Sequence, residues 1–258
     1  MWMLACYQQV APFSLKPAMA TSSGGKTLLT PTPYAIKMAL LDVAIRTRGL
    51  AEGERLFPAL RDLSITLELP KELMVIKGFG KSWRPVESKD SQKKDETAEQ
   101  FEARLREKLA ERIERGQYPF YATIAYREYV YYRQAFRLAL TAPGGATLPP
   151  ELAQLLPGIN YLGKRGGFVQ LTRLPETVEQ LPEGRFVTLT PDQISNFYSV
   201  GTLQMLDDCG PSLTFQRANI YSGERVTLGK ERIVRHVVLP YQLKRSSRGY
   251  SYYEYITA

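Results

Sequence analysis

A capped helix between two strand-like segments is the feature that most constrains how this chain can fold. Thr32 and Pro33 are residue types that begin helices, and apolar side chains then recur on one face until Gly49 ends the segment. Before this helix, Trp2–Val10 has the length and composition of a short strand. After it, Leu63–Leu69 alternates between apolar and polar residues, as a half-buried strand does. The chain therefore opens with a strand, a helix and a strand.

Further segments extend this order. Pro119–Arg133 is the longest strand candidate, and Phe136–Leu140 follows almost at once, which predicts a hairpin. A short helix from Leu152, a glycine-rich loop and a strand over Phe168–Arg173 come next. With the segment between residues 70 and 117 set aside, the order approximates the β-α-β-β-α-β ferredoxin-like arrangement.

The segment that is set aside has the composition of an insertion. From Lys77 to Glu96 the chain is rich in Gly, Ser, Lys and Asp, which is typical of a stretch that is mobile or ordered by a partner. Thr97–Arg115 then predicts a charged helix that ends at Gly116. Its apolar stripe is too narrow for a central core helix, so we place it outside the main fold.

The C-terminal part is predicted to be mostly β. Beyond Pro175 the chain contains short strand-like runs broken by Gly and Pro. These runs are Phe186–Leu189, Thr202–Leu206, Leu213–Ile220, Arg232–Leu239 and Tyr250–Ile256. The expected class is α+β, with one domain over residues 1–174, an insertion over 70–117 and a mostly β subdomain over 175–258.

The charge of the chain limits its function. A net charge of +8 and a pI near 9.4 favour a polyanionic partner, either nucleic acid or an anionic membrane. No apolar run approaches the roughly 18 residues of a spanning helix, and Met1–Val10 is too short for a signal peptide, so we expect a cytoplasmic nucleic-acid-binding protein. Cys6, Cys209 and His236 are too few and too scattered to predict a metal site, a disulfide or a cofactor.

The longest strand candidate separates two kinds of side chain. In steps of two, one face is expected to pack, and the other mixes rings with cations. The packed set is Phe120, Ala122, Ile124, Tyr126 and Val130, and the other set is Tyr121, Thr123, Arg127, Tyr129, Tyr131 and Arg133. Aromatic rings stack on unpaired bases while arginines hold phosphates, which predicts RNA contact by Arg127, Tyr129 and Tyr131. The alternative is that tyrosines simply favour strands.

The loop formed by Gly163, Lys164, Arg165, Gly166 and Gly167 is the second candidate. Without side chains at three positions, backbone N–H groups can converge on an anion, and the two cations add charge beside it. The alternative is a helix-to-strand turn that needs glycine for positive φ values. Both interpretations can hold together, so we predict that the loop contacts RNA.

Further basic residues are predicted to contact RNA. Lys16 and Lys26 lie in an irregular basic stretch, and the insertion places cations around one tryptophan. The C-terminal basic run faces only Glu224 and Glu231, an excess that favours a phosphate backbone or an acidic partner. The residues chosen from the insertion and from this run are Lys77, Lys81, Trp83, Arg84, Arg235, Lys244 and Arg245.

Two enzymatic patterns are weak. Ala20–Thr27 matches a relaxed nucleotide-binding loop, and Leu203–Asp208 resembles an acidic strand end for magnesium, but Thr30–Pro33 separates the first motif from the helix it should open. His236 lies in an alternating strand, where a histidine is usually structural. It could still serve in RNA cleavage by the 2′-hydroxyl, although no spacing selects a partner for it.

The order of these segments resembles the RAMP superfamily of CRISPR-associated proteins. The resemblance is carried by the N-terminal strand, PTPYAIKMALLDVAI, REYVYYRQAFRLAL, LPPELAQLLPGINYLGKRGG and FVQLT, and it covers about Trp2–Arg173. Within the superfamily, the chain is similar to the fifth Cas family, the subunit at the foot of type I Cascade complexes.

The resemblance implies a ferredoxin-like body with an inserted thumb at residues 70–117. Such a subunit grips the five-prime handle of the CRISPR RNA, docks the large and backbone subunits, and meets target DNA only indirectly, in antiviral defence. Only Gly163–Gly167 corresponds to a family motif, and no catalytic residue is expected. One subtype cleaves precursor RNA with a Tyr, Lys and His set, so the alternative is a metal-independent endoribonuclease that uses His236.

Overall fold

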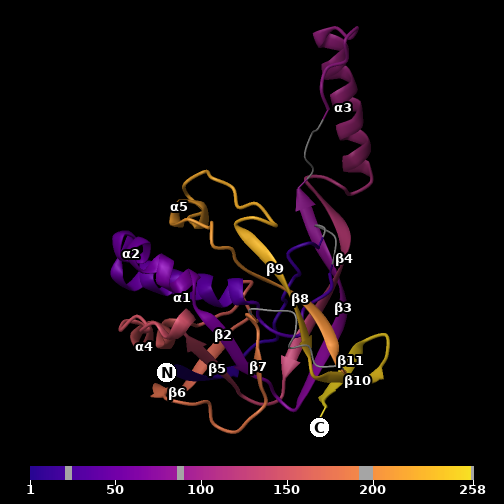
Figure 1. Cartoon of the computed structure of the whole chain (residues 1–258). Coiled ribbons are helices and arrows are strands. Elements are labelled where there is room, and N and C mark those ends of the chain that lie inside the picture. Colours follow the sequence, from indigo (N-terminus) through magenta and orange to yellow (C-terminus); the bar gives the residue numbers. More distant parts are fainter. Residues whose placement is uncertain (21–24, 86–89, 192–199, 257–258) are drawn as a thin grey trace. The chain divides into compact units, whose positions relative to one another are not determined.

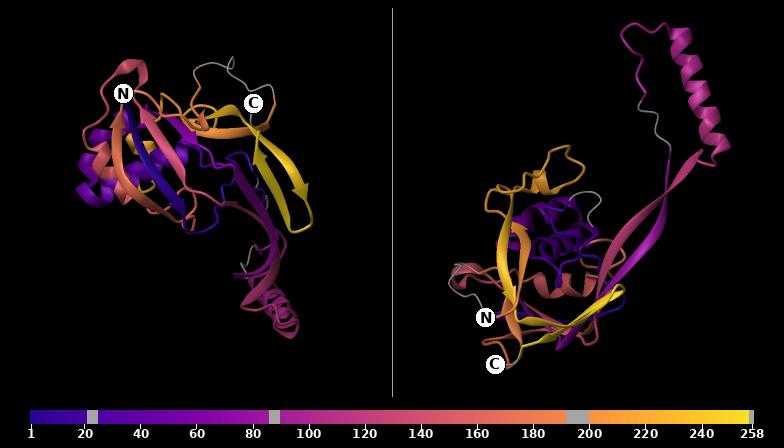
Figure 2. Two further views of the ribbon diagram at one scale, coloured as in Figure 1. Left: turned by 90° about the horizontal axis from the view of Figure 1, so that it is seen from below. Right: turned by 90° about the vertical axis from the view of Figure 1, so that its right-hand side faces the viewer.

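The computed structural model describes residues 1–20, 25–85, 90–191 and 200–256. The chain forms two compact units. We call residues 1–77 together with 127–258 the body, and residues 78–126 the arm. Each unit is described by itself below (Figures 1 and 2).

A five-stranded antiparallel sheet lies at the centre of the body (Figure 1). Its strands are β1 (Trp2–Gln9), β2 (Ser64–Glu68), β5 (Phe136–Thr141), β6 (Val169–Val178) and β7 (Phe186–Thr188). The sheet order is β6-β1-β5-β2-β7. Counted along the chain within this sheet, its first four strands therefore lie in the order fourth, first, third, second. That order is the ferredoxin-like one. The α+β class and the ferredoxin-like arrangement predicted from the sequence are confirmed.

Helices of the body pack onto this sheet and form one apolar core with it. They are α1 (Pro33–Arg48), α2 (Leu50–Arg61), α4 (Leu152–Leu155) and the short 3₁₀ turn η2 (Leu156–Gly158), whereas the 3₁₀ turn η1 (Pro143–Gly145) has no buried residue. The predicted ends of α1 are confirmed, since the Thr32 side chain accepts the Ala35 N–H at 3.2 Å and Gly49 follows the last turn. Between sheet and helix, the Tyr7 hydroxyl donates to the Leu156 carbonyl at 2.8 Å. Helix α2 was not predicted.

The predicted hairpin of Pro119–Arg133 with Phe136–Leu140 does not form, because the first of these strands belongs to a second sheet. Its strands are β3 (Glu72–Pro85), β4 (Phe120–Tyr132), β10 (Tyr241–Ser246) and β11 (Tyr250–Tyr255), in the order β10-β11-β3-β4. Strand β4 therefore pairs with β3, whereas β5 belongs to the five-stranded sheet. The reason is burial, because Phe136, Leu138 and Leu140 of β5 fill the position between β1 and β2. Strand β3 also continues to Pro85, so the first part of the predicted irregular stretch is a strand, and residues 86–89 lie outside the described residues.

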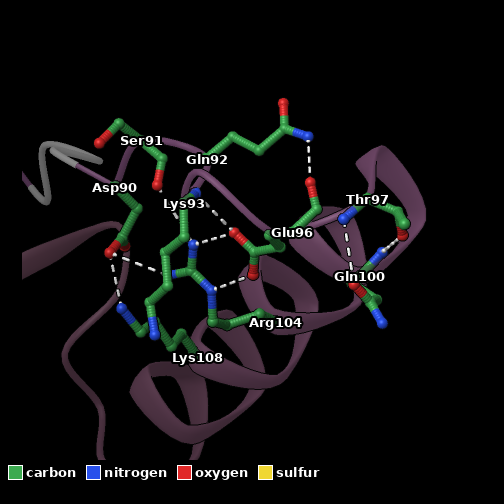
Figure 3. Close-up of polar contacts among 9 residues, drawn as sticks. All are labelled: Asp90, Ser91, Gln92, Lys93, Glu96, Thr97, Gln100, Arg104 and Lys108. Atoms are coloured by element: carbon green, nitrogen blue, oxygen red, sulfur yellow. Dashed lines mark hydrogen bonds and ion pairs between the residues drawn. The ribbon is translucent and has the colours of Figure 1, made fainter.

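In the arm, helix α3 (Ala98–Glu114) begins at Thr97 with a capping box to Gln100, as the sequence predicted. No residue of α3 is buried. Figure 3 shows how the segment before the helix is fastened to it. Arg104 donates to Glu96 at 2.8 Å, and Lys108 donates to Asp90 at 2.6 Å. Side-chain charges, and not apolar packing, hold this end of the arm together.

A third, two-stranded sheet lies beside α1 in the body. It pairs β8 (Thr202–Cys209) with β9 (Arg232–Leu239), and the short helix α5 (Phe215–Ala218) lies between them in the chain. The sequence predicted a strand-like run over Leu213–Ile220, and this was wrong. The Thr214 side chain accepts the Arg217 N–H at 3.4 Å and so caps a helical turn. The division at residue 175 stays a prediction.

Candidate nucleic-acid interface

A pocket of about 290 Å³ lies in the body where four segments meet. They are the loop before α1, the first turns of α1, the glycine loop, and the β8–β9 pair. The pocket is lined by Leu15, Lys16, Thr32, Tyr34, Ala35, Met38, Ala39, Tyr161, Gly163, Lys164, Asp207 and Arg232. The fold therefore brings Lys16, Gly163 and Lys164, three residues predicted from the sequence, to one site.

The glycine loop, Gly163–Gly167, is a tight turn just before the start of β6. Gly163 and Gly166 have φ values of 73° and 111°, which other residues rarely adopt. The Gly167 N–H donates to the Lys164 carbonyl at 3.0 Å and closes the turn. The interpretation as a glycine-dependent turn is thus confirmed. Within the described ranges, the amides of Lys164, Arg165 and Gly166 donate to no acceptor, so they are available to an anion.

Arg232 and Tyr34 form one wall of the pocket. The guanidinium carbon of Arg232 lies 4.2 Å from the centre of the Tyr34 ring, and the same group forms an ion pair with Asp207 at 2.7 Å. Burial raises the pKa of the Tyr34 hydroxyl, and the Arg232 cation partly opposes this rise. Tyr34 therefore keeps its proton at neutral pH. The sequence analysis did not select these residues, although Arg232 and Asp207 belonged to the basic run and the acidic strand end that it noted.

A second surface lies on the outer face of the four-stranded sheet, and we call its residues Met74, Tyr129, Tyr131, Arg245 and Tyr252 the tyrosine face. Tyr129 and Tyr131 are 38% and 42% exposed, as the alternation of β4 predicted. Tyr252 lies opposite both Arg245 and Met74 in the strand register. Tyr131, Met74 and Tyr252 also line one shallow depression of about 280 Å³. These rings and one cation therefore share one surface.

The prediction that one face of β4 packs against the core is wrong for the part of β4 that lies in the arm. Phe120 and Ile124 are 49% and 75% exposed, although Val130, in the body, is buried as predicted. In the arm, β4 forms a ribbon with β3, and no layer of described residues in this unit covers it. Phe79 contacts Tyr126 at 5.2 Å between ring centres, which places Lys81 and Trp83 on the same side as Ile124 by alternation. We call Phe79, Lys81, Trp83 and Ile124 the arm face.

The other predicted contacts are scattered. Arg235 is engaged internally, with Asp208 at 2.8 Å and the Pro191 carbonyl at 3.0 Å. Lys77 donates to the Ser247 carbonyl at 3.3 Å, at the turn between β10 and β11. Lys26, Arg84 and Lys244 are exposed, and Arg127 is half-buried. The structure thus groups some of the predicted cations and leaves the others apart.

The weak enzymatic patterns gain no support. Asp208 accepts from Lys37 at 2.6 Å and from Arg235, and Asp207 from Arg232, so the acidic strand end is occupied by cations of the chain itself. Residues 21–24 of the nucleotide-binding match lie outside the described residues. His236 is exposed on β9, opposite Met205.

The described residues show neither a membrane-spanning helix nor a cluster of metal-ligating side chains. No helix among them is long and apolar enough to cross a bilayer. They also contain no group of three or more His, Cys, Asp or Glu side chains that is suited to a metal ion.

Comparisons with known proteins complete the description. No family model matches the chain. The chain is 44% identical over 62 residues to the CRISPR-associated protein Cas5 of Archaeoglobus fulgidus, a match that covers 22% of this chain. It spans about a quarter (27%) of the length of that relative. A solved CRISPR protein from the same organism aligns over 99% of this chain and 92% of its own, with a TM-score of 0.44 and 11% identity.

Proposed function

We propose that the chain is a member of the CRISPR-associated Cas5 family of RAMP proteins and serves as a non-catalytic RNA-binding subunit of a type I Cascade complex. In this role it grips the five-prime handle of the CRISPR RNA and docks the large and backbone subunits. The docking partners rest on the family assignment. RNA binding has support from the chain's own residues.

The observation that carries the proposal is the pocket at the glycine loop. Lys16 and Lys164 are exposed there, and neither forms an ion pair with another described residue. The available amides of the loop lie beside them. Asp207 is the acidic residue of the pocket lining, and its charge is balanced by Arg232. A phosphodiester at this position gains cations and N–H donors without displacing an internal contact.

The tyrosine face gives a second reason to propose RNA. Base–aromatic stacking contributes about 1–3 kcal/mol per base and depends little on sequence. A sheet surface with partly exposed Tyr129 and Tyr131 suits unpaired bases, and Arg245 suits their phosphates.

The endoribonuclease alternative needs a base and an acid that both reach the cleaved phosphodiester. His236 is the histidine available for it, and it lies on β9, in a different sheet from the tyrosine face. We therefore propose no catalytic residue.

The salt dependence of RNA affinity tests the proposed site. The probe is a labelled single-stranded RNA with a CRISPR repeat sequence. The double variant Lys16→Gln, Lys164→Gln should bind more weakly. Each lost phosphate contact lowers the slope of log affinity against log salt by about 0.7 on single strands, so the slope should fall by about 1.4.

The matched control is the double variant Arg46→Gln, Arg48→Gln. It removes the same charge from exposed positions at the opposite end of α1. Its salt slope should equal that of the unaltered chain. Equal slopes in all three proteins would remove the pocket from the RNA site, and no binding by any of them would overturn the proposed function.

A further inference from the structure

The interior of the pocket is built for more than a phosphate. Its wall along α1 is apolar, with Ala35, Met38 and Ala39 in the lining, and Leu15 adds a further apolar side chain. An anion gains nothing from such a wall, because phosphate oxygens need donors. Pockets that bind organic groups combine an apolar lining with a few fixed polar atoms, and they begin at roughly 300 Å³. The pocket volume of about 290 Å³ lies at that lower limit and suits one flat ring system.

Arg232 supplies a fixed planar surface. Its Nε and Nη2 atoms both lie 2.7 Å from the Asp207 carboxylate, so the guanidinium is clamped in one plane. One face of that plane lies against the Tyr34 ring. The Arg232 side chain is 33% exposed, so part of the group remains open toward the pocket. A guanidinium held in this way can stack on a heterocycle and donate to its acceptor atoms.

The cations lie at the rim and the planar groups in the wall. Lys16 and Lys164 are exposed, whereas Tyr34 and Tyr161 are partly buried in the lining. This division matches a nucleotide, in which a flat aromatic base is joined through its ribose to a charged phosphate. A protein ligand with an acidic side chain would use the cations but would leave the planar wall without a partner.

We propose that this pocket receives one unstacked base of the bound RNA, with the adjoining phosphate at Lys16 and Lys164. The inference rests on the proposed RNA-binding function and adds a position in the RNA that must be unpaired. A base in a helical stem cannot enter the pocket, because its ring edges are paired and its faces are stacked.

A scan of abasic positions tests the inference. A series of repeat RNAs, each lacking one base but keeping its phosphates, is titrated against the full chain. One position should lose about ten-fold or more in affinity, within the range that stacking contributes, and its neighbours should lose less. A profile without such a position, obtained with RNA that still binds, would overturn the pocket while leaving the proposed function intact.

A pocket-filling variant assigns that position to the pocket. Ala35→Leu adds bulk inside the lining and keeps a good helix former in α1. It should weaken the intact RNA by about the same factor as the critical abasic site, and the two changes together should cost no more than either alone. Ala59→Leu, the same change at an exposed position of α2, is the control and should leave the profile unchanged.

Adenosine monophosphate distinguishes an RNA subsite from a free-nucleotide site. If it competes poorly with RNA, and the abasic profile depends on Ala35, the base belongs to the RNA chain as proposed. If it binds tightly to the unaltered protein and is blocked by Ala35→Leu while the abasic profile is flat, the pocket is a mononucleotide site and the inference is wrong. If no RNA binds at all, the proposed function fails first, and the inference fails with it.

Discussion

The body and the arm differ in which side chains they bury and which they expose. In the body, charges are buried in pairs, and the Lys37–Asp208 ion pair is almost fully enclosed, with side-chain exposures of 3% and 1%. In the arm, apolar rings are exposed, and Phe79 and Trp83 are 76% and 64% accessible. Helix α3 of the arm has no buried residue, whereas α1 of the body has seven.

This difference shows which parts of the chain are constrained by folding. A buried pair costs free energy unless both partners are present, so the body fixes the positions of its charges. In the arm, Phe79 contacts Tyr126 but remains 76% exposed, so packing within the arm accounts for little of the arm face. The packing of the body accounts for the positions of its charges, whereas packing within the arm does not account for the exposed rings of the arm face.

The largest expected effect compares one phenylalanine in each unit. Phe57 is 1% exposed and packs against Phe215, so Phe57→Ala should lower the free energy of unfolding by about 3–5 kcal/mol. Phe79→Ala, in the arm, should change it by less than about 0.5 kcal/mol. Denaturant unfolding of both variants measures the contrast. Equal losses would mean that the arm face packs onto something in the isolated chain.

The buried ion pair should come next. Lys37→Met leaves Asp208 with Arg235 as its remaining cation, and we expect a loss of about 3 kcal/mol, because breaking a buried pair leaves charge uncompensated. Arg46→Met breaks the exposed pair with Asp42 and should cost at most about 0.5 kcal/mol. Both are compared by denaturant unfolding. A loss for Lys37→Met no larger than for its control would show that the pair is not enclosed in solution.

A smaller effect is expected from backbone strain. Gly166 has a φ of 111°, so Gly166→Ala should destabilise the body by about 1–2 kcal/mol although a methyl group there meets no atom within 4 Å. Gly80→Ala in the arm meets open space too, and its φ lies outside the strained range, so it should change stability by less than about 0.5 kcal/mol. Thermal unfolding separates the two. Identical behaviour would contradict the geometry of the glycine loop.

The smallest effect on stability concerns Glu96, which fastens the segment before α3 to the helix. Hydrogen bonds from Arg104, and then from the Lys93 N–H, lower the pKa of Glu96 from its ordinary value of 4.5 to about 2. Because the folded pKa is lowered, the contribution of the Glu96 contacts with Arg104 and Lys93 is complete above about pH 4.5 and is lost as the pH falls toward 2. A carboxyl-carbon NMR titration reads this pKa directly.

Arg104→Ala should raise the pKa of Glu96 back toward 4.5. Arg106→Ala, which removes the exposed partner of Glu102, should leave it where it is. An ordinary pKa for Glu96 in the unaltered chain would mean that the contacts of Figure 3 do not persist in solution.

Local signals in the sequence predicted the elements whose ends are set by neighbouring residues. Thr32 and Pro33 begin α1, and the alternation of Leu63–Leu69 marks β2, because both patterns act within a few residues. Helix α2 was missed because Gly49 ends one helix and directly precedes the next, and because Pro58 lies inside α2. The pairing of β4 with β3 was missed because it joins strands separated by an entire helix, and no local pattern records it.

The candidate site divides in the same way. Lys16 and Lys164 were found from charge and from glycine spacing, which are visible in short windows. The Tyr34–Arg232 stack joins positions nearly 200 residues apart, so only the fold brings it to the pocket. Arg235 was predicted as an RNA contact because it belongs to the C-terminal basic run. Its ion-pair partner Asp208 could not be identified without the pairing of β8 with β9.

The central claim is that the body binds RNA without cleaving it. The direct measurement incubates the purified chain with end-labelled repeat RNA in EDTA and divides each sample between a native and a denaturing gel. The account predicts a shifted band on the native gel and intact RNA on the denaturing gel. No shift at low salt would contradict RNA binding, and a discrete cut that disappears in His236→Ala would replace the proposed function with the endoribonuclease.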